Sequence, residues 1–337
     1  MKTDNGPMLS RRRLLQSGLC AASAAAVASM RPTALAAANT SLTFQLSWLH
    51  SVQFGGSYIA AEKGYWTDLG LDVSLASGGP NAPVEPPVVA GTAIMGISAA
   101  DYTAAAVENG APFKILAVAM QKNPFAISSL PGNPVQTPAD LVGKSIGMAT
   151  ANTPVLKALC DLNGVDIDAI EIVPTQYDGA PLLAGQVDCL LSWSTDLPVA
   201  MVMQGAEPNV MLLADHGYAV HSQTYIATED AIANRRAELV GLLKGEIMGW
   251  NDYLFDTDAA AALAVARYPD AGLDLATQKL QAERQVPLMF SDLTETRGFG
   301  WFTEDTVAAN IETLALLGRS VTPDLWDRSI LEEVHGG

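Results

Sequence analysis

Cysteine, histidine and positive charge are scarce in this sequence. It has 3 cysteines and 4 histidines in 337 residues, with no CxxC or HExxH spacing among them. We therefore expect no metal site and no cofactor. Lysine and arginine together number 19 against 36 aspartates and glutamates, which gives a net charge of −17. An acidic excess of this size argues against nucleic acid and anionic membrane surfaces as partners.

Long apolar runs are also missing, except near the N-terminus. Residues 14–30 form an alanine-rich run that polar residues interrupt and that is short for the ~20 residues of a membrane span. The run follows three arginines at 11–13 and precedes small residues at 34–38. This order is typical of an exported bacterial precursor. We interpret 1–38 as a twin-arginine export signal, with a membrane anchor as the alternative, and expect the mature chain in the periplasm.

Two cysteines, Cys160 and Cys189, lie beyond this signal, both in apolar segments. In the periplasm they could form a disulfide. Their apolar surroundings favour two buried thiols instead, because free cysteine behaves as a small hydrophobic residue.

Short apolar strands alternate with helical stretches over most of the chain, which is the pattern of an α/β protein. Strands are predicted at 42–47, 72–76, 95–97, 114–120, 145–148, 170–174, 188–191 and 210–213. After residue 228 the apolar spacing becomes mostly helical. A mature chain of about 300 residues exceeds one comfortable core, so we expect two lobes.

Two segments mark where the chain would cross between the lobes. The first, 125–140, is strand-like and then rich in proline and glycine, and the second, 223–228, is short and strand-like. These crossings predict lobe one at 41–128 and 228–337 and lobe two at 129–227. Together the two crossings would form a two-segment hinge.

The segment after the first predicted strand carries a family resemblance. Residues 48–60 are WLHSVQFGGSYIA, followed by KGYW at 63–66 and GLDV at 70–73. This string resembles the opening of the nitrate/sulfonate/taurine group of ABC-transporter solute-binding proteins. Within the group it is most similar to the binders of thiamine-pyrimidine precursors, and the similarity extends over about 42–228.

The resemblance implies a type II periplasmic binding protein, in which two α/β lobes close on a small molecule. A protein of this kind acts as a monomer and delivers its solute to an ABC permease in the inner membrane. The same fold also occurs in a pyrimidine synthase that uses pyridoxal phosphate. The histidine of that enzyme aligns near Tyr102 here and its cysteine-rich motif has no counterpart, so we expect no enzyme.

Turns that follow the predicted strands supply the candidate ligand-binding residues. In open α/β sheets the carboxyl ends of the strands face the ligand crevice, so these turns are expected to converge. The candidates are Trp48, Gln53, Phe54, Tyr102 and Gln121 from lobe one, and Asn152, Thr153, Tyr177, Asp178, Trp193 and Asp196 from lobe two. Trp48 and Trp193 are expected to stack on a flat ligand, one from each lobe.

The polar candidates indicate the chemistry of the solute. Asp178 and Asp196 either accept hydrogen bonds from amino groups of the ligand or cap helices. No arginine occurs in these turns, although arginine is the natural clamp for a sulfonate or carboxylate. We therefore expect a flat nitrogen heterocycle, first of all a thiamine pyrimidine precursor. A sulfonate, a flavin or another aromatic solute is the alternative within transport, and a periplasmic enzyme on the same fold is the alternative outside it.

Overall fold

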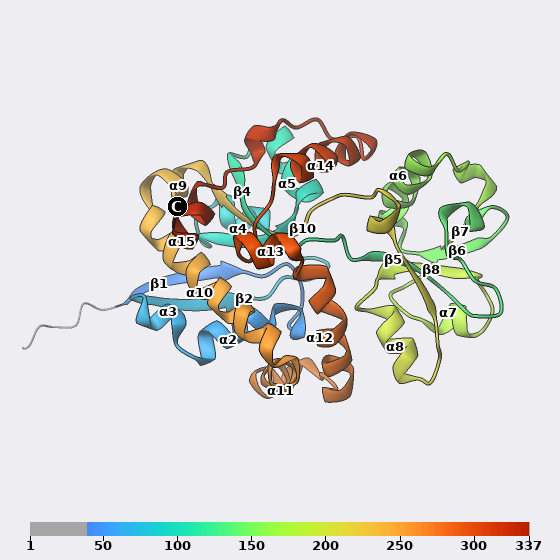
Figure 1. Ribbon diagram of the computed structural model, residues 1–337, viewed down its shortest axis with the longest axis horizontal. Helices are drawn as coiled ribbons and strands as arrows, with labels where there is room; N and C mark the ends of the chain where they lie inside the picture. Colours follow the sequence, from blue (N-terminus) through green and yellow to red (C-terminus); the bar gives the residue numbers. More distant parts are fainter. Residues whose placement is uncertain (1–38, 337) are drawn as a thin grey trace, which may run out of the picture. The chain divides into compact units, whose positions relative to one another are not determined.

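Two five-stranded mixed sheets form the framework of the protein (Figure 1). The structure is a computed structural model that describes residues 39–336, so the predicted export signal at 1–38 lies outside the described residues. The first sheet has the strand order β2-β1-β3-β10-β4, and the second has the order β7-β6-β8-β5-β9. The predicted α/β class is confirmed.

The strands of the first sheet are β1 (Thr40–Gln45), β2 (Leu71–Ala76), β3 (Met95–Ala99), β4 (Phe113–Met120) and β10 (Ser222–Thr228). Those of the second are β5 (Phe125–Ser129), β6 (Ser145–Met148), β7 (Glu171–Pro174), β8 (Cys189–Trp193) and β9 (Asn209–Leu212). β1 runs parallel to β2 and β3, whereas β10 is antiparallel to its neighbours β3 and β4. In the second sheet β6 runs parallel to β7 and β8, and β5 is antiparallel to β8 and β9.

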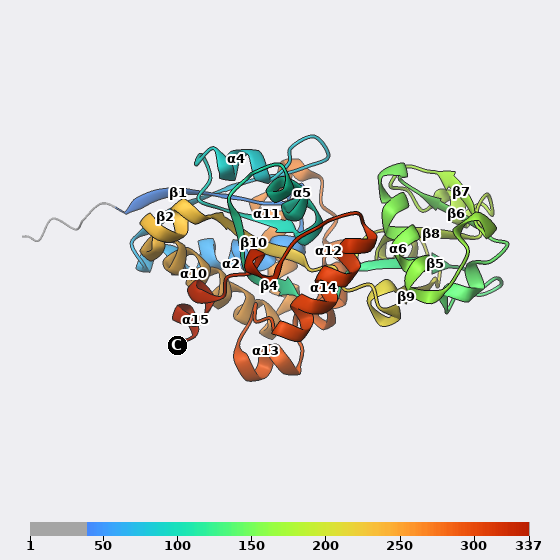
Figure 2. The ribbon, with the colours of Figure 1, turned by 90° about the horizontal axis from the view of Figure 1, so that it is seen from above.

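Helices connect the strands of each sheet and form the C-terminal part of the chain. The first sheet is joined by α2 (Gly55–Glu62), α3 (Tyr65–Asp68), α4 (Glu85–Val89) and α5 (Ala100–Glu108). The second has α6 (Thr153–Asn163), α7 (Ala180–Leu183) and α8 (Leu197–Met203). The chain after β10 is helical, as predicted, with α9 (Glu229–Asn234), α10 (Arg236–Phe255), α11 (Thr257–Arg267), α12 (Leu275–Met289), α13 (Asp292–Arg297), α14 (Glu304–Leu316) and α15 (Ser329–His335), shown in Figure 2.

We call the first sheet with α2–α5 and α9–α15 lobe one, and the second sheet with α6–α8 lobe two. None of the helices in the described residues is long and apolar enough to cross a membrane. The same residues contain no group of histidine, cysteine, aspartate and glutamate side chains suited to a metal ion.

The predicted lobe boundaries are wrong by one strand at each crossing. The prediction places β5 in lobe one, but β5 pairs with β8 and β9 of lobe two. It places β10 in lobe two, but β10 pairs with β3 and β4 of lobe one. The proline and glycine at 131–132 mark only where β5 ends, because turn residues carry no information about the sheet that a strand joins. The chain crosses between the lobes at 121–124 and 217–221.

A close helix contact in lobe one fixes α2, the helix that follows the Trp48 turn. A Cβ atom at Gly249 of α10 would lie 2.0 Å from the carbonyl oxygen of Gly56 in α2. Only glycine lets the two helix backbones approach this closely. A Cβ atom at Gly56 would in turn meet the Trp250 ring at 2.3 Å. The two glycines therefore hold α2 directly against the long helix α10.

Lobe one buries an ionisable carboxyl group in this contact region. Glu246 is fully buried, and its Oε1 accepts hydrogen bonds from Ser57 Oγ (2.8 Å), Trp250 Nε1 (2.9 Å) and the Tyr225 hydroxyl (3.1 Å). Its Oε2 has no partner among the described residues. Desolvation raises the pKa of Glu246 to about 7, although the three hydrogen bonds favour the charged form. Near neutral pH the side chain is therefore close to half protonated.

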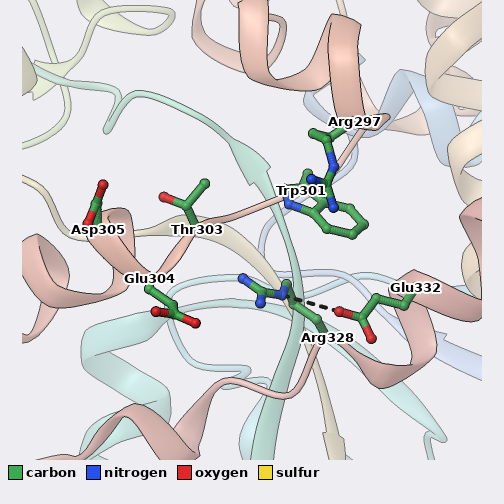
Figure 3. Close-up of a pocket in the computed structure, with 7 residues that line it drawn as sticks. All are labelled: Arg297, Trp301, Thr303, Glu304, Asp305, Arg328 and Glu332. Carbon is green, nitrogen blue, oxygen red and sulfur yellow. Dashed lines mark ion pairs between the residues drawn. The ribbon is translucent and has the colours of Figure 1, made fainter. Parts of the chain in front are cut away.

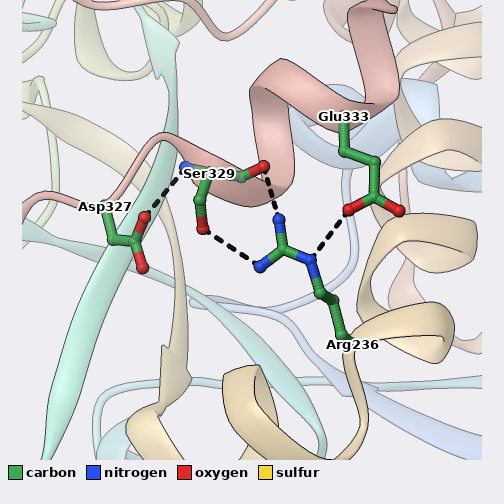
Figure 4. Close-up of polar contacts among 4 residues, drawn as sticks. All are labelled: Arg236, Asp327, Ser329 and Glu333. Atoms are coloured by element: carbon green, nitrogen blue, oxygen red, sulfur yellow. Dashed lines mark hydrogen bonds and ion pairs between the residues drawn. The ribbon is translucent and has the colours of Figure 1, made fainter. Parts of the chain in front are cut away.

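The C-terminal helix is tied to lobe one by the Arg236 side chain (Figure 4). Its Nε donates to Glu333 at 2.8 Å, and its two terminal nitrogens donate to the Ser329 hydroxyl and carbonyl oxygens at 3.2 and 2.8 Å. Asp327 accepts from the Ser329 backbone N–H at 2.8 Å. These bonds join the start of α10 to α15.

Cys160 and Cys189 are free thiols buried in lobe two. The expectation of two buried thiols is confirmed. Desolvation raises their pKa values to about 11 and about 12, so both remain protonated at neutral pH.

Candidate ligand-binding site

Parallel strands in each lobe bring predicted site residues to a common sheet edge. Trp48 follows β1 and Tyr102 follows β3, and these two strands are parallel. In lobe two Tyr177 follows β7 and Trp193 ends β8, both of which run parallel to β6. Because parallel strands end at the same edge, the predicted turns of each lobe lie together.

Aromatic side chains from both lobes meet at these edges. The ring centroids of Trp48 and Tyr177 lie 6.3 Å apart with an edge-on geometry of 67°. Both rings remain exposed, by 36% and 61%, and Tyr102 is exposed by 66%. Exposed rings gathered in one place are the kind of surface that binds a ligand or partner. We call these three exposed rings, Trp48, Tyr102 and Tyr177, together with the buried ring of Tyr218, the aromatic cluster.

Trp48 is held by two loops that follow neighbouring strands. Its carbonyl oxygen accepts from the Gly78 backbone N–H at 3.0 Å. A Cβ atom at Gly78 would lie 2.5 Å from the Ser47 carbonyl carbon, so glycine is needed for this approach. The Gln45 amide donates to the carbonyl oxygens of Leu46, Ala76 and Ser77 at 3.0, 3.2 and 3.1 Å. These bonds fix the turn that carries the indole ring.

Asp101 and Tyr102 occupy the first turn of α5. The helix begins directly after β3, and the Ala100 backbone N–H donates to the His221 carbonyl oxygen at 3.0 Å. Desolvation raises the pKa of Asp101, opposed by the backbone N–H groups of Asp101 and Tyr102. Desolvation also raises the pKa of Tyr102, with further contributions from the neighbouring Asp101 carboxylate and the Tyr177 side chain. These interactions place the Tyr102 hydroxyl within electrostatic range of both side chains.

Tyr218 joins the cluster from the second crossing. Its ring is buried and packs edge-on against Phe125, with centroids 6.4 Å apart. Its backbone N–H donates to the Leu213 carbonyl oxygen at 3.1 Å, and Gly217 before it has a φ of 90°. Desolvation raises the pKa of Tyr218, and Asp101 and Tyr102 raise it further. The cluster therefore contains residues from both lobes and from the segment between them.

The charge around the cluster is negative. Asp101 lies within it, and Glu85 also raises the pKa values of Asp101 and Tyr102. The basic side chain that acts on Asp101 is Arg319, and that residue pairs with Glu108 at 3.3 Å. A negatively charged ligand would therefore be repelled here, whereas a neutral ligand with N–H donors would find acceptors.

The turn that contains Trp193 and Asp196 forms a second contact of lobe two with lobe one. Trp193 is partly buried against the core of lobe one and lies edge-on to Phe125 at 6.4 Å. Helix α8, which follows the turn, contacts α12. Asp196 exposes its side chain and makes no capping hydrogen bond to α8. Surrounding protein nevertheless raises the pKa of Asp196 by desolvation to about 6. This carboxyl group is thus available as an acceptor.

One predicted site residue lies in the core, and three others make hydrogen bonds within the protein. Phe54 is completely buried and packs among the apolar side chains of the lobe-one core, so the prediction that it contacts the ligand is wrong. The Gln121 side-chain N–H groups donate to the carbonyl oxygens of Val118 and Trp301, at 2.9 and 3.2 Å. Asp178 Oδ1 accepts from the Ala180 N–H at 3.0 Å and caps α7. The Thr153 hydroxyl donates to the Thr150 carbonyl at 2.8 Å.

Gln53 and Asn152 remain half-buried at turns after β1 and β6. The Gln53 carbonyl accepts from Gln285 at 3.3 Å, and Asn152 starts α6 without a side-chain capping bond. Both stay predictions as ligand contacts.

Sequence reasoning passed over two members of the candidate site. Asp101 has the sequence signature of a helix cap, and Tyr218 carries no local signal beyond its place near the second crossing.

The linings of two cavities in the described residues do not include Trp48, Tyr102 or Tyr177. The larger, about 340 Å³, is lined by Arg297, Trp301, Thr303, Glu304, Asp305, Arg328 and Glu332 (Figure 3). Arg297 and Arg328 flank the Trp301 ring at 4.2 and 5.7 Å from its centroid, and Arg328 pairs with Glu332 at 3.6 Å. The smaller, about 170 Å³, lies at the two crossings beside Gln121 and Tyr218. Acidic neighbours offset the arginines of the larger cavity, so it offers no built anion site.

Comparisons with known proteins agree with the expected family. The profile of the family described as NMT1/THI5 like matches residues 51–260. The riboflavin-binding protein RibY of Chloroflexus aurantiacus is 27% identical over 298 residues, which cover 84% of each chain. The formylaminopyrimidine-binding protein of Halalkalibacterium halodurans is 20% identical over 68% of this chain and 71% of its own. The resemblance to solute-binding proteins is confirmed, while the ligands of these relatives differ.

Solved structures show the fold alone. The periplasmic aliphatic sulphonate-binding protein SsuA of Escherichia coli superposes with a TM-score of 0.63 at 16% identity, covering 82% of this chain and 86% of its own. The desulfurization enzyme DSZB superposes with a TM-score of 0.60 at 15% identity, covering 88% of this chain and 99% of its own. The expected periplasmic binding protein fold is confirmed, and the fold itself is compatible with binding and with catalysis.

Proposed function

The chain belongs to the NMT1/THI5-like family, and we propose that it captures a flat nitrogen heterocycle for an ABC importer. The observation that carries this proposal is the contact between Trp48 of lobe one and Tyr177 of lobe two, both of which remain exposed. Two exposed rings on different lobes can cover a planar ligand and remove water from both of its faces. Binding and delivery need no chemical step.

The chemistry around the cluster limits the class of solute. Asp101 lies beside Tyr102 and Asp196 is exposed in the Trp193 turn, so both can accept hydrogen bonds, and no arginine occurs in the turns that carry the predicted contacts. An amino or imide group of a heterocycle suits such acceptors, whereas a sulfonate would lose its water without gaining a cation. We therefore place flavins and aminopyrimidines ahead of sulfonates. The relatives RibY and formylaminopyrimidine-binding protein are named for solutes of these two types.

Ligand capture would work by closure of the two lobes. The crossings at 121–124 and 217–221 are short segments that can act as a hinge. A ligand that touches both lobes binds the closed state better than the open state and so shifts the population toward it. The inner-membrane permease would then receive the closed, loaded protein, which acts as a monomer.

Calorimetric titration tests the proposal directly. Riboflavin, formylaminopyrimidine and a short alkanesulfonate are each titrated into the purified mature protein, and small molecules released on denaturation are identified by mass spectrometry. We expect one heterocycle to bind with one site per chain and to be recovered unchanged. Binding of the sulfonate alone, or conversion of a bound heterocycle to a product, would contradict the proposal.

Export through the twin-arginine pathway is part of the same proposal. The arginines at 11–13 and the small residues at 34–38 predict a mature N-terminus near Ala37 or Asn39. Mass spectrometry of the protein from a periplasmic fraction measures that terminus. An intact N-terminus recovered from the membrane pellet would show that the segment is an anchor. Replacement of Arg11 and Arg12 by lysine is expected to retain the precursor in the cytoplasm.

Asp196 should make ligand binding depend on pH. Its pKa lies at about 6, and the ionised carboxylate is the form that accepts from ligand amino groups. Affinity should therefore fall by about tenfold between pH 7.5 and pH 5, because about a tenth of the carboxyl groups remain ionised one pH unit below the pKa. Calorimetry at both pH values measures the change. The Asp196→Asn variant should lose most of this dependence.

The matched control is Asp178→Asn, since Asp178 is an exposed capping residue. That variant should keep the wild-type pH profile. Equal profiles for wild type and Asp196→Asn would remove Asp196 from the site.

A further inference from the structure

Gln223 combines two unfavourable features that the rest of the fold avoids. Its φ of +47° makes it the one non-glycine residue with positive φ among residues 39–336. Its side chain is 1% exposed, yet neither Nε2 nor Oε1 has a hydrogen-bond partner among the described residues. A left-handed backbone and an unpaired buried amide each cost free energy. Outliers of this kind concentrate at functional sites.

The backbone of Gln223 lies next to the helix start that carries Tyr102 of the aromatic cluster. It is the second residue of β10, the strand that lies between β3 and β4 in the first sheet. Along β3, Ser222 pairs with Ala99 and Thr224 with Ser98, so Gln223 is the extra residue of a bulge. Because β10 is antiparallel to β3, this bulge lies beside the end of β3, where α5 begins. The first turn of α5 carries Asp101 and Tyr102.

Other buried glutamines in lobe one show what a structural amide does here. The Gln45 amide donates to three carbonyl oxygens, as described above. Gln278 accepts from the Val52 backbone N–H at 2.7 Å. Each of these side chains makes hydrogen bonds to backbone groups. Within residues 39–336, the Gln223 amide makes no such hydrogen bond.

We infer that Gln223 is a specificity-determining residue whose carboxamide pairs with an adjacent donor and acceptor on the bound heterocycle. A carboxamide carries both a donor and an acceptor and can make two parallel hydrogen bonds with such an edge. Flavin and aminopyrimidine rings both present one. The amide breaks no hydrogen bond when its side-chain torsions turn it toward a ligand. The free energy of its hydrogen bonds to the ligand is therefore not offset by a lost bond within the protein. The inference rests on the proposed function and names the side chain that recognises the edge of the ligand ring by hydrogen bonds.

Replacement of Gln223 by methionine separates recognition from structure. Methionine has nearly the same length and flexibility but no amide. We expect Gln223→Met to melt at the wild-type temperature or above, because an unpaired buried amide is removed, and to bind the native heterocycle at least tenfold more weakly. Gln278→Met is the matched control: it removes a paired amide and is expected to lower the melting temperature.

A ligand analogue with a changed ring edge provides a second measurement. If riboflavin binds, 3-methylriboflavin lacks the ring N–H donor and should bind the wild-type protein at least tenfold more weakly. Gln223→Met should not distinguish the two compounds. If formylaminopyrimidine binds instead, the Gln223→Glu variant replaces the ligand analogue as the second measurement. Glutamate keeps the shape of glutamine but lacks the amide donor.

The outcomes distinguish this inference from the proposed function. If the wild-type protein binds neither heterocycle, the proposed function fails and the inference fails with it. If the wild type binds and Gln223→Met binds equally tightly with a lower melting temperature, the proposed function stands and Gln223 is structural. A stable variant with weakened binding and lost discrimination supports the inference.

Discussion

Replacing Trp48 by alanine is expected to weaken ligand binding by tenfold to a hundredfold while leaving the fold intact. The indole ring is exposed and faces Tyr177 of the other lobe, so it loses little packing in the free protein. Stacking of a planar ring on an aromatic side chain contributes about 1–3 kcal/mol, which corresponds to this range of affinity. Calorimetry measures the affinity, and circular dichroism measures the fold. Tyr177→Ala should act in the same direction.

Leu49→Ala is the matched control for this experiment. Leu49 is the next residue and is also exposed, by 55%, but it is aliphatic. The Leu49→Ala variant should bind ligand with wild-type affinity. A Trp48→Ala protein that folds and binds normally would show that the aromatic cluster is not the binding site.

Trp193 should respond differently from Trp48, although the sequence gives both the same role. Trp193 is partly buried against the core of lobe one and against Phe125. Its truncation removes packing between the lobes as well as a stacking surface. A loss of affinity in Trp193→Ala therefore assigns it to the site only if the melting temperature is unchanged.

The free energy of unfolding is expected to respond to pH through Glu246 by about 3 kcal/mol. The pKa of this carboxyl group is 4.5 when unfolded and about 7 in the folded protein. A folded pKa above the unfolded one means that protonation stabilises the fold, so the contribution is complete below pH 4.5. It is lost as the pH rises through about 7. A difference of one pH unit between the folded and unfolded pKa values corresponds to about 1.4 kcal/mol.

The Glu246→Gln variant isolates this contribution. Its Oε1 can keep the hydrogen bonds from Ser57, Tyr225 and Trp250, while the side chain no longer titrates. Relative to wild type, the variant should gain about 3 kcal/mol between pH 4.5 and pH 8. Chemical denaturation at several pH values measures this difference. Parallel stability curves for the two proteins would mean that Glu246 does not titrate in this range.

The comparison of wild type with variant is necessary because other carboxyl groups act in the opposite sense. Backbone hydrogen bonds lower the pKa values of Asp140, Asp188 and Asp274 in the folded protein. These groups stabilise the fold above their unfolded pKa and lose that contribution as the pH falls. They are present in both proteins, so their effect cancels in the difference.

The sequence by itself determined the fold class, the family and the sheet edges that carry the candidate site residues. Apolar alternation and turn residues are local signals, so the strands and the helical C-terminal part were predictable. The position of Trp48 and Tyr177 after parallel strands follows from the same pattern. Their contact across the two lobes was not predictable from that pattern, because it depends on how the lobes fold against each other.

Only the tertiary structure decided which side chains are free to bind. Phe54 and Gln121 stand in turns that resemble binding turns, but distant residues bury the first and occupy the amide of the second. Asp101 looks like a helix cap, yet it lies beside Tyr102 and Tyr218. The sheet membership of β5 and β10 and the unpaired amide of Gln223 also depend on partners far away in the chain. Pairing, burial and hydrogen-bond satisfaction are properties of the folded chain, and no local pattern encodes them.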